Sequence, residues 1–420
     1  MPHLTSSVLF CFTLLLVATS AAPSKDHGNS YKVHRHAVGS GPKDGVLALE
    51  KAYRKRNWTP PEGLTAAVAF HRDIVANPVH STIKEDVAVE RRGSDIGTVT
   101  VEPYGTNTEY LCLVQIAEQS FRMDFDTGSA DFWVFNTALP AADQTGHDAV
   151  YSPTQSRSFH SVPDSWFDVS YGDNSSTKGL VGTETVQIGE ITVVGQAVEL
   201  PSTVSSQFSG DTNSDGIVGF GFSQTGNSIR PSPMPTFFEN AAPKLKANVF
   251  TANLKDGTPG QYEFGTIDPS AYQAPLAYTG VDKSGGLWQF DLSRYAIGPD
   301  TYAGTVSPAI ADTGSSLLML DPAIVNDYYA QVPTSTDDFQ GKIFPCDTAL
   351  PDFSFGIGST MARIPGNLLN YTSVPGTSDC YGGVQSNLGN GLNVLGDIMF
   401  ASQFVVFDAG AMRIGFAPHA

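Results

Sequence analysis

The sequence predicts a mostly β protein made of two related lobes, with the functional site between them. An Asp-Thr-Gly triplet flanked by apolar residues occurs twice, at 126–128 and 312–314, positions 186 residues apart. Most of the chain around the triplets reads as short strand patterns bounded by Gly and Pro, of which there are 41 and 27. With 420 residues and 41% apolar residues, the chain is long enough for two lobes with their own cores.

Strand patterns outnumber helical ones along the chain. The clearest strands are expected at 98–101, 111–116, 183–188, 191–194 and 261–264. Helices are expected at 46–56, 235–241, 322–332 and 397–403. The turn-rich stretch 265–269 lies between the two triplets, so we expect an N-terminal lobe at 93–266 and a C-terminal lobe at 267–420.

The N-terminus has the features of a secretory signal. An apolar run covers residues 8–17, and small residues follow it at 18–22. The run is too short to span a membrane stably. Residues 1–21 are therefore predicted to be a cleaved signal peptide, and the protein to be secreted and extracellular, without a membrane anchor.

The segment after the signal differs in charge from the rest. Residues 23–92 contain 12 Lys and Arg against 8 Asp and Glu, whereas the whole chain contains 24 against 42. A basic segment can dock electrostatically on an acidic body. The pair Arg91-Arg92 ends the segment, so residues 22–92 are predicted to be a removable propeptide. The alternative is a solvated, partly helical linker.

Charge and cysteine usage exclude other classes of protein. The net charge of −18 argues against nucleic acid as a partner. The Cys and His residues show no zinc-ligand spacing, so no metal is predicted. Cys346 and Cys380 are a candidate disulfide in an exported protein. Cys112 lies in a strand pattern and is predicted to be a buried, inert thiol.

The two triplets carry the predicted chemistry. A single copy is an ordinary strand ending in a turn, but two copies between apolar stretches predict two buried carboxyl groups. If Asp126 and Asp312 meet, they cannot both ionise easily and will share a proton. One is then a base that activates water, and the other is an acid. Gly128 and Gly314 would let the backbone pass close to the carboxylates.

Three other features surround the triplets. The hydroxyl groups of Thr127 and Thr313 can tie the two loops together. An apolar strand ending in Gly follows each triplet, at 215–220 and 393–397, which strengthens the case for a duplication. Residues 166–179 read as an exposed hairpin that is either a lid over the site or a decoration.

Together these residues resemble the pepsin-like aspartic proteases, and most closely the secreted fungal members. The resemblance covers the chain from about Thr98 to the C-terminus. It implies a bilobal pepsin-like acid protease fold with the active site in the cleft between the lobes. The matching segments are 125–134 and 311–316 for the catalytic motifs, 171–173 for the flap, 215–219 for a packing strand, and Cys346 with Cys380 for the family disulfide.

The resemblance implies roles for individual residues. Asp126 and Asp312 would be catalytic and hold the attacking water, while Ser129 and Ser315 would hydrogen-bond their outer oxygens. Trp133 would hold the hydroxyl group of the flap residue Tyr171. The substrate-binding residues implied are Tyr171, Gly172, Asp173, Gly128, Gly314, Ser315, Phe208 and Ile217, with Phe208 and Ile217 as apolar walls of the main specificity pocket.

The activity implied is that of an endopeptidase made as a zymogen. It would cleave peptide bonds between bulky apolar residues at acidic pH, act as a monomer without a cofactor, and bind statine-type peptide inhibitors. Asp173 predicts some acceptance of Lys beside the scissile bond. The rival interpretations are a catalytically silent relative that binds proteins, and a carbohydrate-processing enzyme with two carboxylates.

Several points depart from the family pattern or stay open. Residues 116–120 replace a Gly-containing turn before the first motif, and Asn174 stands where the flap often has Gly. Either Lys51 or Lys55 is expected to pair with the catalytic carboxylates in the zymogen. The candidate glycosylation sites are Asn57, Asn174 and Asn370.

Overall fold

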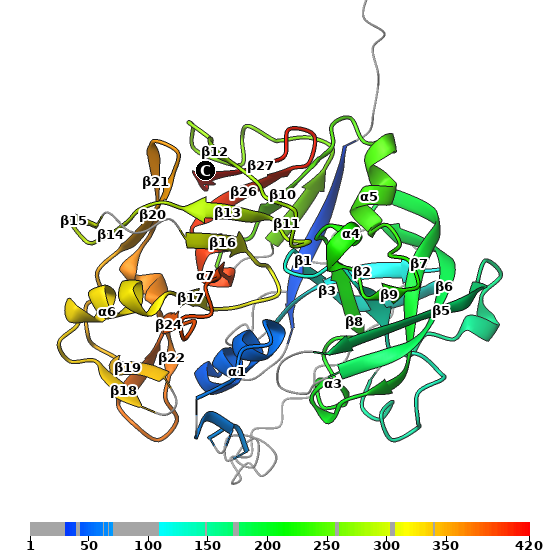
Figure 1. Ribbon diagram of the computed structural model, residues 1–420, viewed down its shortest axis with the longest axis horizontal. Coiled ribbons are helices and arrows are strands. Elements are labelled where there is room, and N and C mark those ends of the chain that lie inside the picture. The colour runs from blue at the N-terminus through cyan, green and yellow to red at the C-terminus, as the bar shows by residue number, and fades with distance from the viewer. Residues whose placement is uncertain are drawn as a thin grey trace, which may run out of the picture.

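The protein is rich in β-strands, and its helices are short (Figure 1). The computed structural model describes residues 30–38, 43–61, 63–65, 67–69, 109–147, 149–170, 176–256, 260–302, 307–338 and 341–420. The mostly β fold class is confirmed. The predicted signal peptide, the strand at 98–101 and the flap tip at 171–175 lie outside the described residues.

Among the described residues, one large sheet runs through the molecule. Its strands in spatial order are β12 (Ala277–Gly280), β27 (Arg413–Pro418), β26 (Gln403–Asp408), β10 (Val249–Asn253), β11 (Gly260–Phe264), β1 (Tyr31–Val38), β2 (Glu109–Ile116), β3 (Gln119–Asp126), β8 (Gly216–Gly219), β4 (Phe132–Val134), β7 (Ile191–Val204), β6 (Ser176–Ile188), β5 (His160–Ser170) and β9 (Ile229–Arg230). Strands from both halves of the chain share this sheet, which therefore joins them.

Three smaller sheets are built from the second half of the described chain. The first contains β13 (Gln289–Leu292), β16 (Ser307–Ala311), β25 (Asn393–Leu395), β17 (Leu318–Leu320) and β24 (Val384–Ser386). The second contains β15 (Asp300–Tyr302), β14 (Tyr295–Ile297), β20 (Phe353–Ile357) and β21 (Thr360–Ile364). The third contains β18 (Thr336–Asp338), β19 (Gly341–Pro345), β23 (Asp379–Gly382) and β22 (Asn370–Ser373).

The helices are α1 (Gly45–Lys55), α3 (Ser206–Ser209), α4 (Ser223–Gly226), α5 (Phe237–Ala241), α6 (Pro322–Ala330) and α7 (Asp397–Phe400), with 3₁₀ turns η1 (Pro153–Gln155), η2 (Ala242–Lys244) and η3 (Gly366–Leu369). All four predicted helices exist but begin or end at slightly different residues. Thr236 caps α5 with Glu239 in a capping box, which fixes its start. The helix predicted to reach 403 ends at Phe400, because Gln403 already belongs to β26.

The sequence duplication is a duplication of structure. β3 runs parallel to β8, with Asp126 opposite Gly219, and β8 pairs antiparallel with β4. β16 likewise runs parallel to β25, with Ala311 opposite Leu395, and β25 pairs antiparallel with β17. Each Asp-Thr-Gly loop thus emerges from a strand packed against the apolar strand predicted to accompany it.

The predicted propeptide is part of the fold. β1 lies in the large sheet between β11 and β2, with Tyr31 opposite Phe264 and Arg35 opposite Cys112. α1 lies between the part of the chain drawn in cyan and green and the part drawn in yellow to red (Figure 1). This arrangement places residues 45–55 where they can touch both halves.

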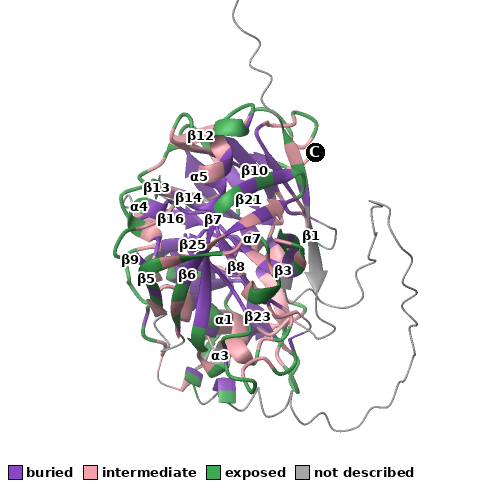
Figure 2. Cartoon of the chain, turned by 90° about the vertical axis from the view of Figure 1, so that its right-hand side faces the viewer, coloured by how far each residue is buried: buried purple, intermediate pink, exposed green. Residues whose placement is uncertain are grey.

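The interior is apolar, as the composition predicts. Figure 2 shows the buried positions gathered inside the molecule and the exposed ones along its edge. Large aromatic side chains such as Trp288, Phe250 and Phe407 are fully buried there and contact one another. No helix within the described ranges is long and apolar enough to cross a membrane.

The predicted disulfide and the predicted burial of Cys112 are confirmed, whereas the inertness of the Cys112 thiol stays a prediction. Cys346 and Cys380 form a disulfide across a separation of 34 residues. It links the residue that follows β19 to the neighbouring strand β23 of the same sheet. Cys112 is a buried thiol in β2.

Candidate active site

Two buried carboxyl groups from the two halves of the chain converge on one point. Asp126 ends β3, and Asp312 directly follows β16. The Oδ1 atoms of both lie 2.6 Å from the same atom, Nζ of Lys55, so they are no more than twice that distance apart. The backbone N–H of Gly128 donates to Asp126 Oδ1 at 2.8 Å, and that of Gly314 donates to Asp312 Oδ1 at 3.1 Å.

The outer oxygens of the carboxylates have matching partners. Ser129 Oγ donates to Asp126 Oδ2 at 2.5 Å, and Ser315 Oγ donates to Asp312 Oδ2 at 2.7 Å. These are the contacts that the resemblance implies. Because each carboxylate is held on both oxygens, its position is fixed before any substrate binds.

Two threonines cross-link the loops. The N–H of Thr127 donates to Thr313 Oγ1 at 3.1 Å, and the N–H of Thr313 donates to Thr127 Oγ1 at 3.0 Å. Each hydroxyl also donates to a carbonyl of the opposite half, Thr127 to Ala311 at 2.8 Å and Thr313 to Phe125 at 2.5 Å. The hydroxyl link predicted from the sequence is present, with two backbone bonds in addition.

Replacing Thr127 or Thr313 by Val is expected to lower the free energy of unfolding by about 2 to 6 kcal/mol. Valine keeps the shape but leaves a buried N–H and a buried carbonyl without partners, which costs about 1 to 3 kcal/mol for each group. Denaturant unfolding of the full chain measures the change. Thr203→Val, at an exposed position of β7, is the matched control and should change stability by less than about 0.5 kcal/mol. A buried variant as stable as this control would contradict the prediction.

The loop glycines are required by close approach. A side chain at Gly128 would place its Cβ 2.5 Å from Asp312 Oδ1, and one at Gly314 would place it 2.8 Å from Asp126 Oδ1. Real Cβ atoms do not approach oxygen so closely. The Gly of each triplet therefore makes room for the carboxylate of the other.

The predicted propeptide occupies this site with two consecutive cations. Of the two candidates, Lys55 lies between the carboxylates, whereas Lys51 lies 3.9 Å from Asp124 Oδ2. Arg56 also contacts Asp312 Oδ2, a contact that the sequence interpretation missed. Burial by itself would raise the pKa of Asp312, but the charges of Lys55 and Arg56 lower that pKa far below its ordinary value.

Helix α1 positions Lys55 and Arg56 at the carboxylates because its apolar face packs against the protein interior. Val46, Leu49 and Tyr53, the face predicted from the sequence, are all buried. Asp44 accepts a hydrogen bond from the N–H of Leu47 at 3.0 Å and caps the helix. The hydroxyl group of Tyr53 donates to the carbonyl of Ser386 at 2.7 Å. The helix is thus docked on the C-terminal half at the turn that precedes Lys55.

Apolar side chains line the first loop. Phe208 and Ile217 are half-buried and pack on a cluster that contains Trp133. The rings of Trp133 and Phe208 are 5.0 Å apart, and Ile217 lies opposite Trp133 in the pairing of β8 with β4. Among the described residues, Trp133 Nε1 has no hydrogen-bond partner. Tyr171, Gly172 and Asp173 lie outside the described residues.

A buried acidic pair supports the same loop and was also missed. Asp131 accepts a hydrogen bond from the N–H of Ser228 at 2.6 Å. Burial raises the pKa of Glu199 well above its ordinary value, and the neighbouring Asp131 carboxylate raises it further. Burial likewise raises the pKa of Asp131. At least one of these groups therefore carries a proton at acidic pH and can donate to the other.

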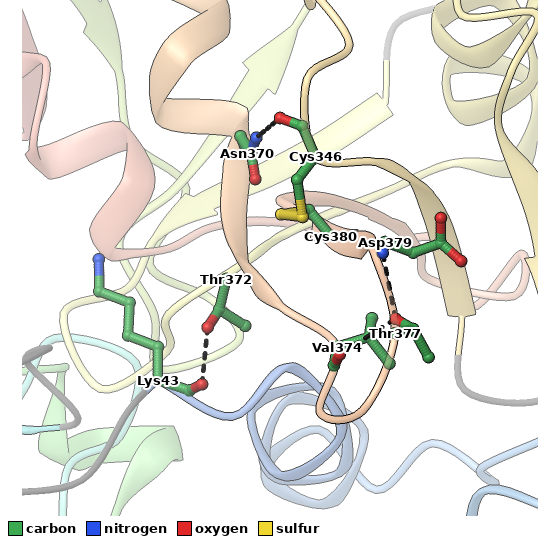
Figure 3. Close-up of a disulfide and its surroundings, with 8 residues drawn as sticks. All are labelled: Lys43, Cys346, Asn370, Thr372, Val374, Thr377, Asp379 and Cys380. Atoms are coloured by element: carbon green, nitrogen blue, oxygen red, sulfur yellow. Dashed lines mark hydrogen bonds between the residues drawn. A yellow bond between two sulfur atoms is a disulfide. The ribbon is translucent and has the colours of Figure 1, made fainter.

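The structure describes two of the three glycosylation candidates. Asn57 is exposed in the turn after α1. Asn370 is half-buried, and its Nδ2 donates to the carbonyl of Cys346 at 3.1 Å, while Thr372 donates to the carbonyl of Lys43 at 2.8 Å (Figure 3). Asn174 lies outside the described residues. Glycosylation at these positions stays a prediction.

Two Asp-Thr-Gly loops, related by duplication and linked through their threonines, define the class of two-lobed aspartic hydrolases. No group of His, Cys, Asp and Glu that could hold a metal occurs in the part of the chain that the structure describes. Comparison with known proteins identifies the family: the family described as eukaryotic aspartyl protease matches residues 109–419, and the chain belongs to it.

Three of its relatives are fungal proteases. The chain is 46% identical over 327 residues to aspergillopepsin-1 of Aspergillus flavus, covering 77% of this chain and 80% of the relative. It is 38% identical over 431 residues to a putative aspergillopepsin A-like aspartic endopeptidase of Aspergillus fumigatus, covering 99% of both. It is 43% identical to penicillopepsin-1 of Penicillium janthinellum, covering 77% of this chain and 99% of the relative. The protein is accordingly an aspartic-type endopeptidase.

Proposed function

We propose that this chain is the zymogen of a secreted aspartic endopeptidase that hydrolyses peptide bonds between bulky apolar residues at acidic pH. The observation that carries the proposal is the convergence of Asp126 and Asp312 on Lys55 Nζ, at 2.6 Å each. In this proposal residues 1–21 are a signal peptide, 22–92 a propeptide, 93–266 the N-terminal lobe and 267–420 the C-terminal lobe.

Removal of the propeptide frees the carboxylates for catalysis. They then share one proton and hold a water molecule where Lys55 Nζ now lies. One carboxylate takes a proton from the water as it attacks the scissile carbonyl, and the other protonates the carbonyl oxygen. The resulting tetrahedral diol breaks down as a proton passes to the leaving amine. No cofactor or metal takes part.

Two comparisons support a removable N-terminal segment. The family match begins at residue 109, after the predicted propeptide. Penicillopepsin-1 is covered to 99% by 77% of this chain, so the rest of this chain has no aligned counterpart in that protein. The basic charge of residues 23–92 fits a segment that binds the ionised site at neutral pH and leaves on acidification.

The apolar side chains beside the first loop support the proposed substrate preference. Phe208 and Ile217 offer partly exposed apolar surface beside the first loop, which suits a bulky apolar side chain next to the scissile bond. In the proposed flap, Tyr171 closes over the substrate, and its hydroxyl group is the partner of Trp133 Nε1. Backbone pairing with the flap gives recognition of an extended peptide.

The flap aspartate Asp173 is proposed to accept Lys beside the scissile bond through its negative charge. We expect Asp173→Ser to lower kcat/KM for cleavage after Lys by about tenfold, the loss of a charge-assisted contact, while cleavage after Phe stays the same. Paired peptides that differ only at that residue measure the ratio. An unchanged ratio would exclude this role for Asp173.

The proposed function is tested with acid-treated protein and denatured haemoglobin at about pH 3.5, with and without a statine-type inhibitor. Hydrolysis that the inhibitor abolishes is the expected result. Inhibitor binding without hydrolysis would point to a catalytically silent relative. Activity toward a glycoside instead would favour a carbohydrate-processing enzyme. Sedimentation of the same sample tests the proposed monomer.

A further inference from the structure

Arg56 binds at a place that Lys55 does not use. Its Nη2 contacts Asp312 Oδ2, and its Nη1 donates to the carbonyl of Gly128 at 3.0 Å. Lys55 takes the inner Oδ1 atoms of Asp126 and Asp312. The two cations therefore fill two separate positions.

The second position is built for a guanidinium group. Gly128 belongs to the first Asp-Thr-Gly loop and Asp312 to the second, so the planar group spans both halves of the chain. The side chain of Arg56 is only 7% exposed, and a charge buried to this extent is stable only when it is paired. A Cβ on Gly128 would collide with Arg56 Nη2. A glycine at this place leaves the space that the guanidinium fills.

Other charged groups nearby are already paired. On the same helix Glu50 and Arg54 form an ion pair, and Lys51 faces Asp124 of β3. The charged and titratable groups that face Asp312 are therefore Lys55, Arg56 and the carboxyl group of Asp126, which shares Lys55 Nζ with it. The N–H of Gly314 and the hydroxyl group of Ser315 also donate to its carboxylate. A guanidinium keeps its proton at all relevant pH values, so only protonation of the carboxylate can weaken this contact.

We propose that the active site contains a guanidinium-binding site, formed by Asp312 Oδ2 and the Gly128 carbonyl, and that Arg56 occupies it so that the zymogen opens at a lower pH than Lys55 alone would allow. The inference rests on the proposed zymogen function. The contact between Arg56 and Asp312 is a second ion pair, besides those of Lys55, that must break before the prosegment leaves. Because the carboxylate must gain a proton before the prosegment leaves, the ratio of closed to open zymogen falls by about tenfold per pH unit for each proton taken up.

The test compares five full-length zymogens: wild type, Arg56→Gln, Arg56→Lys, Lys55→Gln and Lys51→Gln. Each is brought to a series of pH values, and two quantities are followed: conversion to the shorter form, and early binding of a fluorescent statine-type inhibitor. The second readout reports access to the carboxylates without requiring cleavage. Lys51→Gln is the matched control, because it removes one propeptide charge away from the paired carboxylates.

Arg56→Gln is expected to raise the midpoint pH of opening by about one unit, which corresponds to a roughly tenfold higher open fraction at a fixed pH. Lys51→Gln should follow the wild-type curve. Arg56→Lys should fall between wild type and Arg56→Gln, because it keeps the charge but cannot hold both oxygens at once. All variants differ only in the propeptide, so equal activity after full conversion shows that each has folded.

The outcomes separate this inference from the proposed function. If Lys55→Gln shifts the curve and Arg56→Gln does not, the guanidinium site is without effect and the inference is wrong. If neither variant shifts it, or if wild-type protein binds the inhibitor equally at neutral pH, the zymogen proposal itself fails. If Arg56→Gln does not fold, an Arg56→Lys curve that coincides with wild type overturns the inference.

Discussion

Asp126→Asn and Asp312→Asn are each expected to lower peptide hydrolysis by about 10⁴-fold while the protein keeps its fold. An amide has nearly the same shape: its oxygen can accept from the N–H of Gly128 or Gly314, and its NH2 group can donate to the hydroxyl oxygen of Ser129 or Ser315. The loops therefore have no reason to move. It cannot take a proton from water or share one with the remaining carboxylate. The double variant should be little worse than either single one, because the two groups act as a unit.

The measurement compares kcat/KM on an apolar peptide substrate for variants purified in the mature form. Because the variants cannot convert themselves, wild-type enzyme is added in trace amount and then removed with immobilised inhibitor. Asp124→Asn is the matched control, since it removes a carboxylate from the same strand two residues earlier. A variant at Asp126 or Asp312 that kept more than about one hundredth of the activity would contradict the two-carboxylate mechanism.

The paired loops could be predicted from the sequence because the duplication is local. A motif that repeats with the same neighbours folds in the same way twice, so Thr127 and Thr313, or Ser129 and Ser315, acquire equivalent partners. The helix at 46–56 was predictable for a similar reason. Its apolar residues recur at helical spacing within about two turns, so the pattern is visible in a short stretch of sequence.

The contacts missed depend on how distant elements dock. Arg56 directly follows α1, and it reaches its partner Asp312 only because α1 docks between the two halves of the chain. Glu199 meets Asp131 because β7 pairs with β4, a pairing that no periodicity in either segment predicts. The only available signal was that both are charged residues within apolar surroundings, which is too common to identify a partner. Sequence patterns therefore indicated which residues are buried or paired, but they did not identify the partners that come from distant parts of the chain.

In the proposed zymogen, Lys55→Gln is expected to cause opening at about pH 5.5, where the wild-type protein is expected to stay closed. Removing the ammonium leaves two buried carboxylates facing each other, a cost of about 3 kcal/mol or more, which is roughly a hundredfold in the closed-to-open ratio. The pH dependence follows from Asp312. Its pKa is lowered in the closed form, so the closed form binds fewer protons than the open one. The closed form is therefore favoured at higher pH and loses that advantage as pH falls below the pKa of the open form.

Conversion at a series of pH values measures this effect, with the mass of the shorter product checked at each. The midpoint should rise by about two units relative to wild type if one proton is taken up on opening, and by about one if two are. The slope of the logarithm of the open-to-closed ratio against pH counts those protons directly. Identical curves for Lys55→Gln and wild type would mean that the ammonium group between Asp126 and Asp312 does not hold the propeptide in place, and that some other part of residues 22–92 does.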